Sequence, residues 1–254
     1  MKKGFLRRVL RIIEESDLVL EVLDARFPEE TRNEFIEREI VEKGKELVLA
    51  LNKSDLVSKN FAEKKKKELG KSFRAIFVSS KKKLGIKNLR EIILRKAKEK
   101  EKLVVGVLGY PNTGKSSLIN ALSGRKAALT SISAGFTRGE QFISLSSRVK
   151  LIDSPGVIPF SEKDETRLAL ISAKSPWQLK DAESAAEKLI EFLREARPRE
   201  FEKFFGVKLD NKSAEQLIEE IALKKKRLLK KGLPDTETTA REILLQWQKG
   251  KILS

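Results

Sequence analysis

The chain of 254 residues contains no cysteine and no histidine, and its formal net charge at pH 7 is +17. These absences exclude disulfides, thiol catalysis and imidazole chemistry, and they leave oxygen ligands and a hard cation such as Mg²⁺ for any metal site. The basic excess favours RNA over a membrane as partner, because no apolar run approaches the roughly 18 residues of a membrane span. A solvated surface on a heat-adapted, cytoplasmic protein is the alternative explanation of the same charge.

The first hundred residues alternate between helical and strand patterns. Residues 5–15 carry apolar side chains at helical spacing, and the acidic residues that follow favour a surface helix over a targeting peptide. Apolar runs predict buried strands with helices between them, which is the pattern of an α/β doubly wound, mainly parallel sheet covered on both faces. The predicted strands are residues 18–23, 47–51 and 75–78, and the predicted helices are residues 31–41, the segment around 64–67 and residues 88–100.

Polar motifs follow the second and third predicted strands. Asn52-Lys53-Ser54-Asp55 fits a guanine-reading arrangement in which the Asp55 carboxylate accepts from the base N1–H and exocyclic amine, while Asn52 supports the base and Lys53 lies along its face. An Asn-x-x-Asp turn is also common cap chemistry, so the motif gains its meaning only beside a phosphate site. The backbone N–H groups predicted to meet guanine O6 belong to Ser79, Ser80 and Lys81.

A fourth predicted strand, residues 103–108, leads into a phosphate-binding loop. Gly109–Ser116 fits the pattern G-x-x-x-x-G-K-S and precedes a predicted helix over residues 117–122, which is the context that such a loop requires. Backbone N–H groups would surround phosphate oxygens at a helix N-terminus, Lys115 would reach the β- and γ-phosphates, and the Ser116 hydroxyl would complete the shell of Mg²⁺. The full spacing argues against an ordinary glycine turn. The predicted phosphate contacts are Asn112, Thr113, Gly114, Lys115, Ser116 and Ser117.

Residues 124–139 are polar and poorly periodic, and they predict a mobile segment. Within it, Thr137 is expected to close over Mg²⁺ when a triphosphate is bound, and Thr130 is the rival candidate. The predicted catalytic residues are Lys115, Thr137 and Asn112.

Residues 141–146 and 148–152 predict a hairpin that ends at Asp153. Asp153 is expected to hold Mg²⁺ through a water molecule, and the backbone N–H of Gly156 is expected to meet the γ-phosphate. The predicted metal-holding residues are therefore Ser116, Thr137 and Asp153.

Beyond residue 160 the pattern becomes helical throughout. This change predicts a nucleotide-binding domain over residues 1–160 and a smaller helical domain over residues 161–254. One predicted helix ends in a basic face that is a candidate RNA contact, although a solvated helix face produces the same charge run. The predicted helices are residues 181–197, 213–231 and 235–249, and the basic residues are Lys224, Lys225, Lys226, Arg227, Lys230 and Lys231.

The order of these segments is unusual, because the base-reading residues precede the phosphate loop. This is the usual GTPase order cut and rejoined, and the chain resembles the circularly permuted GTPases, among them the YlqF family (ribosome biogenesis GTPase A). The resemblance covers nearly the whole chain, although Ala134 stands where that family often has proline. The motifs that carry it are Asp24-Ala25-Arg26, Asn52-Lys53-Ser54-Asp55, Gly109 to Ser117, Gly135-Phe136-Thr137, Asp153-Ser154-Pro155-Gly156, Gly232-Leu233-Pro234-Asp235, Ala240-Arg241 and Gly250-Lys251.

The resemblance implies a GTP-hydrolysing assembly factor that acts on ribosomal RNA or on precursor particles of the large subunit. It also implies that Asn112 helps to hold a K⁺ ion in place of an arginine finger, whereas turn chemistry explains Asn112 equally well. Val157 and Ile158 stand where many GTPases place a water-orienting glutamine, so slow intrinsic hydrolysis is expected. Without the resemblance, the residues predict only a Mg²⁺-dependent, guanine-specific NTPase with a basic surface. A GTP-regulated RNA-binding module and a P-loop kinase are the alternatives, and the guanine-reading motif has no role in the second.

Overall fold

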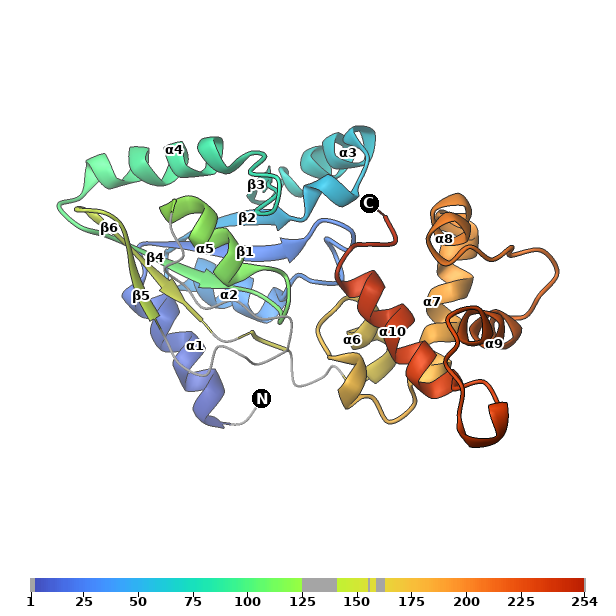
Figure 1. Cartoon of the computed structure of the whole chain (residues 1–254). Helices are drawn as coiled ribbons and strands as arrows, with labels where there is room; N and C mark the ends of the chain where they lie inside the picture. The colour runs from blue at the N-terminus through green and yellow to red at the C-terminus, as the bar shows by residue number, and fades with distance from the viewer. Residues whose placement is uncertain (1–2, 125–140, 155, 159–162, 254) are drawn as a thin grey trace. The chain divides into compact units, whose positions relative to one another are not determined.

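The computed structural model describes residues 3–124, 141–154, 156–158 and 163–253 (Figure 1). The chain divides into two compact units, Met1–Glu162 and Lys163–Ser254. Among the described residues, all strands lie in the first unit and the second is helical. No helix in these described ranges is long and apolar enough to cross a membrane.

Six strands of the first unit form one sheet in the order β3-β2-β1-β4-β6-β5 (Figure 1). All neighbouring strands are parallel except β5, which pairs antiparallel with β6. The predicted doubly wound, mainly parallel sheet is therefore confirmed. β1 is buried at all of its positions, which explains its nearly unbroken apolar sequence. The strands are β1 (Leu18–Asp24), β2 (Glu46–Asn52), β3 (Arg74–Phe77), β4 (Leu103–Leu108), β5 (Gln141–Ser146) and β6 (Val149–Asp153).

Helices cover both faces of this sheet. On one face, Leu20 of β1 belongs to the same buried cluster as Leu89 and Leu118, which lie on two helices. On the other face, Val19 of β1 packs in a cluster with Ile12 and Ile36 of two further helices. Val19 and Leu20 are adjacent in β1 and thus pack into the cores on opposite faces of the sheet, as the side-chain alternation of a strand requires. The first face carries α4 (Ile86–Lys96) and α5 (Lys115–Ser123), and the second carries α1 (Lys3–Glu15), α2 (Glu34–Glu42) and α3 (Lys59–Leu69).

The second unit is a helical bundle with its own core. Trp247 is 2% exposed and donates its indole N–H to the carbonyl of Leu170 (2.8 Å). Leu189 and Leu217 are fully buried on two other helices. Two short helices were not predicted from the sequence, one of which begins after Arg197 with Pro198. The helices are α6 (Glu165–Leu170), α7 (Ala182–Ala196), α8 (Pro198–Phe205), α9 (Ala214–Lys224) and α10 (Thr236–Gln248).

The predicted helix over residues 213–231 is too long. α9 ends at Lys224, and Lys226 then takes a left-handed backbone with φ of 54°, a conformation that costs a non-glycine residue about 1–2 kcal/mol. The following segment doubles back, because Leu229 donates its N–H to the carbonyl of Leu233 (2.7 Å) and Leu228 forms an antiparallel bridge with Pro234. Lysine is a good helix former, so propensity alone does not reveal this end. The six predicted basic residues therefore do not share one helix face.

Candidate functional site

The motifs predicted in the first unit meet at one edge of the sheet. Asn52 is the last residue of β2, Asp153 is the last residue of β6, and the loop from Gly109 follows β4. The strands involved are parallel, so their carboxyl ends share this edge. β1 lies between β2 and β4, so the chain changes direction across the sheet here, and such a switch point is where open α/β sheets bind ligands.

Asn52 connects three of the predicted segments. Its side-chain amide donates to the carbonyl of Thr113 (2.9 Å), and its side-chain oxygen accepts from the backbone N–H and the hydroxyl of Ser80 (3.0 and 2.9 Å). The loop leaves no space beside this amide, because a Cβ added at Gly114 would lie 2.2 Å from Asn52 Nδ2. The φ of Gly114 is +96°, a second reason for glycine. The base-reading motif and the phosphate loop are thus one connected structure.

Asp55, the predicted base-reading residue, is oriented by a serine. Its Oδ1 accepts from the Ser79 hydroxyl (2.5 Å), which in turn accepts from the backbone N–H of Lys82 (3.0 Å). The N–H groups of Ser79 and Ser80 donate to the carbonyl of Leu84 and to Asn52. Of the three N–H groups predicted to meet guanine O6, the described structure leaves only that of Lys81 without a protein acceptor. Only the N–H of Lys81 therefore remains a candidate donor to guanine O6.

Lys53 forms an ion pair with Asp24. Asp24 was predicted to belong to the site only through the family resemblance. The backbone of Lys53 is left-handed (φ 62°), and its ammonium donates to Oδ2 of Asp24 (2.7 Å) at the end of β1. Burial lowers the pKa of Lys53, and Asp24 partly offsets this effect. Burial alone would raise the pKa of Asp24, but Arg26 and Lys53 together hold it far below its usual value. The position of Asp24 at a carboxyl strand end was the sequence signal for a place in this site.

In the phosphate loop, Lys115 is folded back onto the backbone. Its ammonium donates to the carbonyls of Gly109 (3.0 Å) and Tyr110 (2.8 Å), and the residue is 7% exposed. Burial lowers the pKa of Lys115 to about 8, which the charge of Asp153 only partly opposes. A phosphate at the N-terminus of α5 would give this buried cation an anionic hydrogen-bond partner in place of the two carbonyls.

Ser116 and Asp153 form a pair that fits Mg²⁺. The Ser116 hydroxyl donates to Oδ2 of Asp153 (2.7 Å). The other carboxylate oxygen is buried and has no hydrogen-bond partner among the described residues. Burial raises the pKa of Asp153, and Ser116 and Lys115 oppose that rise. A hydroxyl and an unsatisfied carboxylate oxygen are ligands that Mg²⁺ accepts. The third predicted ligand, Thr137, and its rival Thr130 lie outside the described residues.

The segment after β6 lies directly against the phosphate loop. Val157 donates its N–H to the carbonyl of Gly109 (2.9 Å). A Cβ added at Gly156 would lie 2.5 Å from Cα of Pro111, so this close approach requires glycine. Asn112 is half-buried and has a left-handed backbone (φ 60°), whereas Ser117 is exposed in the first turn of α5. All predicted phosphate-loop residues thus lie around one helix start.

The six basic residues predicted to contact RNA fall into two groups. Three serve the second unit itself: Lys224 donates to the carbonyl of Gly206, Lys225 lies over the rings of Phe204 and Phe205 (5.9 and 5.0 Å), and Arg227 pairs with Glu242 (3.8 Å). The other three are exposed, and within the described residues no side-chain hydrogen bond or ion pair engages them. They are Lys226, Lys230 and Lys231.

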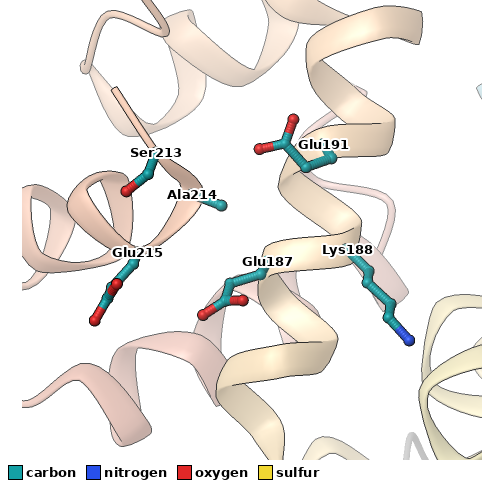
Figure 2. A pocket seen from close by; sticks show the side chains of 6 residues that line it. All are labelled: Glu187, Lys188, Glu191, Ser213, Ala214 and Glu215. Carbon is teal, nitrogen blue, oxygen red and sulfur yellow. The ribbon is translucent and has the colours of Figure 1, made fainter. Parts of the chain in front are cut away.

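A pocket of about 470 Å³ lies between α7 and the start of α9 (Figure 2). Glu187 and Glu191 line it from α7, and Glu215 lines it from α9 (Figure 2). Carboxylates repel phosphate groups, so this pocket is unsuited to RNA.

Comparison with known proteins relates both units to GTPases. The family described as RsgA GTPase matches residues 6–162, and the family described as 50S ribosome-binding GTPase matches residues 104–228. An uncharacterised GTP-binding protein of Methanocaldococcus jannaschii is 41% identical over 96% of this chain, and nuclear/nucleolar GTPase 2 of Arabidopsis thaliana is 32% identical over 99%. This chain spans 65% and 45% of those two relatives.

Two solved structures of YlqF from Thermotoga maritima share the fold. The GNP-bound structure is 25% identical, with a TM-score of 0.68 over 98% of this chain and 95% of the other. The GDP-bound structure is 27% identical, with a TM-score of 0.66 over 97% and 94%.

Proposed function

This chain belongs to the RsgA GTPase family, with its motifs in circularly permuted order, and on that premise we propose that it binds GTP and GDP and hydrolyses GTP during assembly of the large ribosomal subunit. The observation that carries the proposal is the side chain of Asn52, which bonds to Ser80 on one side and Thr113 on the other. One residue thereby joins a guanine-reading motif to a phosphate loop.

The base is recognised by Asp55 and the N–H of Lys81, and the phosphates by the loop from Asn112 to Ser117. Asp55 is fixed by the Ser79 hydroxyl, so its carboxylate is oriented before the base arrives. A carboxylate accepts from the N1–H and the amine of guanine, whereas adenine presents neither donor in that arrangement. The site therefore selects GTP over ATP, which disfavours the kinase alternative.

Ser116 and Asp153 would hold Mg²⁺, which when bound neutralises charge on the β- and γ-phosphates. Lys115 places its ammonium beside the same phosphates once it leaves the carbonyls of Gly109 and Tyr110. Gly156 packs against Pro111 of the loop, and its N–H would stabilise the γ-phosphate. These residues bind the nucleotide and stabilise developing charge.

Val157, the residue directly after Gly156, is buried and apolar and cannot orient the attacking water. We infer that the intrinsic rate is slow and that a ribosomal partner raises it. Asn112 is half-buried in the phosphate loop, and amide oxygens are suitable ligands for K⁺. This ion would supply positive charge where other GTPases use an arginine.

The partner is ribosomal RNA or a precursor particle, contacted through Lys226, Lys230 and Lys231. Free, exposed lysines bind phosphate without the energetic cost of breaking an internal contact. The name of one relative, nuclear/nucleolar GTPase 2, and the description of one matching family, 50S ribosome-binding GTPase, support this choice of partner.

Two assays test the proposal. Single-turnover hydrolysis of GTP, measured with and without ribosomal particles, should be slow alone and faster with large subunits. Co-sedimentation with separated subunits should be stronger with a non-hydrolysable GTP analogue than with GDP. Hydrolysis of ATP at the rate of GTP, or equal sedimentation with both subunits in both nucleotide states, contradicts it.

The second candidate is a GTP-regulated RNA-binding module in which hydrolysis is incidental. The apolar Val157, in place of a water-orienting residue, favours it. Subunit binding that depends on GTP while the hydrolysis rate stays unchanged by particles would identify this function.

A further inference from the structure

Asp24 at the carboxyl end of β1 is fully buried and accepts hydrogen bonds from two cationic side chains, those of Arg26 and Lys53. Arg26 donates from Nε to Oδ1 (3.0 Å) and from a terminal nitrogen to Oδ2 (2.8 Å), and its backbone N–H also donates to Oδ1 (3.1 Å). A bidentate arginine already balances a carboxylate in charge and in geometry. The ammonium of Lys53, 2.7 Å from Oδ2, is therefore a second cation that charge balance does not require.

Lys53 takes this position against two local preferences. Its backbone is left-handed, with φ of 62°, a region that a residue with a Cβ rarely adopts. Its ammonium also leaves water for a protein interior that lowers its pKa. Backbone strain and a buried cation at the edge of a binding site are features associated with function.

The neighbours of Lys53 are the residues assigned to the nucleotide. Lys53 follows Asn52, which reaches the phosphate loop, and precedes Asp55, the residue assigned to the base. Its side chain remains 19% exposed although its ammonium is bound. The protein therefore does not cover the Lys53 side chain completely at this edge of the sheet.

We propose that Asp24, balanced by Arg26, is a positioning residue that fixes Lys53 so that the stem of this lysine packs on the guanine ring. The proposal rests on the proposed nucleotide site. A free lysine loses much rotamer entropy when it is ordered on a ligand, whereas a lysine already held by Asp24 does not lose it on binding. The Asp24-Ala25-Arg26 motif thereby becomes part of the base site.

A double-mutant cycle on GDP affinity tests this role. Asp24→Asn and Lys53→Met should each weaken GDP binding by about tenfold, a loss of about 1.4 kcal/mol. The double variant should bind no more weakly than either single variant, because both remove the same interaction. Thermal unfolding of each variant without nucleotide, measured beside the titrations, shows whether a loss of affinity is accompanied by a loss of stability.

Asp17 provides a matched control at the other end of β1. It also accepts from a lysine, Lys100 (2.6 Å), and from a backbone N–H, that of Val104 (2.9 Å). Asp17→Asn should lower thermal stability without changing GDP affinity. If Asp24→Asn does not fold, Asp24→Glu keeps the charge, moves it by one methylene and replaces Asn in the cycle.

The results separate this proposal from the proposed function. If the wild-type protein binds no guanine nucleotide, the nucleotide site itself is wrong. If it binds GDP but Asp24→Asn binds equally well, or if the losses of the two single variants multiply in the double variant, the positioning role is wrong and Asp24 is a structural ion-pair residue. A loss of affinity in Asp17→Asn as large as that in Asp24→Asn leads to the same conclusion.

Discussion

The sheet edge of the first unit and the basic segment of the second unit were both predicted from short runs of sequence. They differ in how firmly the structure holds the predicted side chains. At the sheet edge, buried partners fix the predicted side chains: Asn52 bonds to Thr113, and Ser116 bonds to Asp153. In the basic segment, half of the predicted cations bond within the unit and half extend into solvent. A motif with fixed spacing at strand ends predicts where each side chain lies, whereas a run of like charges predicts only the net charge of a segment.

The largest effect is expected from Gly114→Ala, which breaks the link between the two halves of the edge. Its Cβ would lie 2.2 Å from Asn52 Nδ2, the atom that donates to Thr113, so the Asn52 side chain must shift away from Thr113. We expect a loss of GDP affinity of about 100-fold, the scale of a misplaced binding group. Gly124→Ala is the matched control, because Gly124 also has a positive φ (+72°) but no atom within 4 Å of an added Cβ. Equal losses in both variants would assign the effect to backbone strain alone.

The next effect concerns the exposed half of the basic segment. Changing Lys226, Lys230 and Lys231 together to Gln should weaken binding to ribosomal particles and reduce the slope of log affinity against log salt by about 2, with GTP affinity unchanged. The control changes three exposed lysines of α3 and removes the same net charge. Equal weakening in both triple variants would mean that only net charge matters. The control residues are Lys64, Lys66 and Lys67.

A smaller effect is expected from the monovalent cation. If Asn112 helps to hold K⁺, replacing K⁺ by Na⁺ should slow single-turnover hydrolysis by about fivefold, or about 1 kcal/mol of transition-state stabilisation, while GDP affinity is retained. Asn112→Ala should hydrolyse slowly in both salts. Equal rates of the wild-type protein in both salts would leave Asn112 as a turn residue.

The smallest effect comes from Glu21, a buried acid of β1 away from the strand end. Burial raises its pKa well above the usual value, and Glu37 adds to this rise. Arg32 donates to both oxygens of Glu37 (2.7 and 2.5 Å), and the buried Glu21 carboxyl keeps its proton over a pH range in which an exposed glutamate is ionised. The folded state then binds more protons than the unfolded state above the unfolded pKa, and the free energy of unfolding falls as pH rises.

Glu21→Gln removes this dependence and keeps a donor for Glu37. We expect the variant to exceed the wild type in free energy of unfolding by about 1 kcal/mol at pH 7 and by less at pH 5. Urea unfolding at both pH values measures the difference. A gain that does not grow with pH would show that Glu21 is ionised in the folded protein.

Strand periodicity and motif spacing were sufficient to predict the sheet and the identity of the edge residues. They could not show that Asn52 spans from Ser80 to Thr113, because that contact joins residues 61 positions apart. The role of Lys225 was hidden for a related reason: its partners, Phe204 and Phe205, lie on α8, a helix too short for its period to be evident. Sequence patterns report local periodicity, and pairings between distant elements require the fold.

Calorimetric titration of Asp55→Asn with guanosine and xanthosine nucleotides tests the proposed guanine site most directly. Asp55 is oriented by Ser79 at the sheet edge, and the substituted amide donates where the carboxylate accepted. We expect GDP affinity to fall by about 1.5–3 kcal/mol, the value of a hydrogen bond to a charged group, and xanthosine diphosphate to bind where the wild-type protein rejects it. Unchanged GDP affinity in Asp55→Asn would contradict the assignment of this edge as a guanine site.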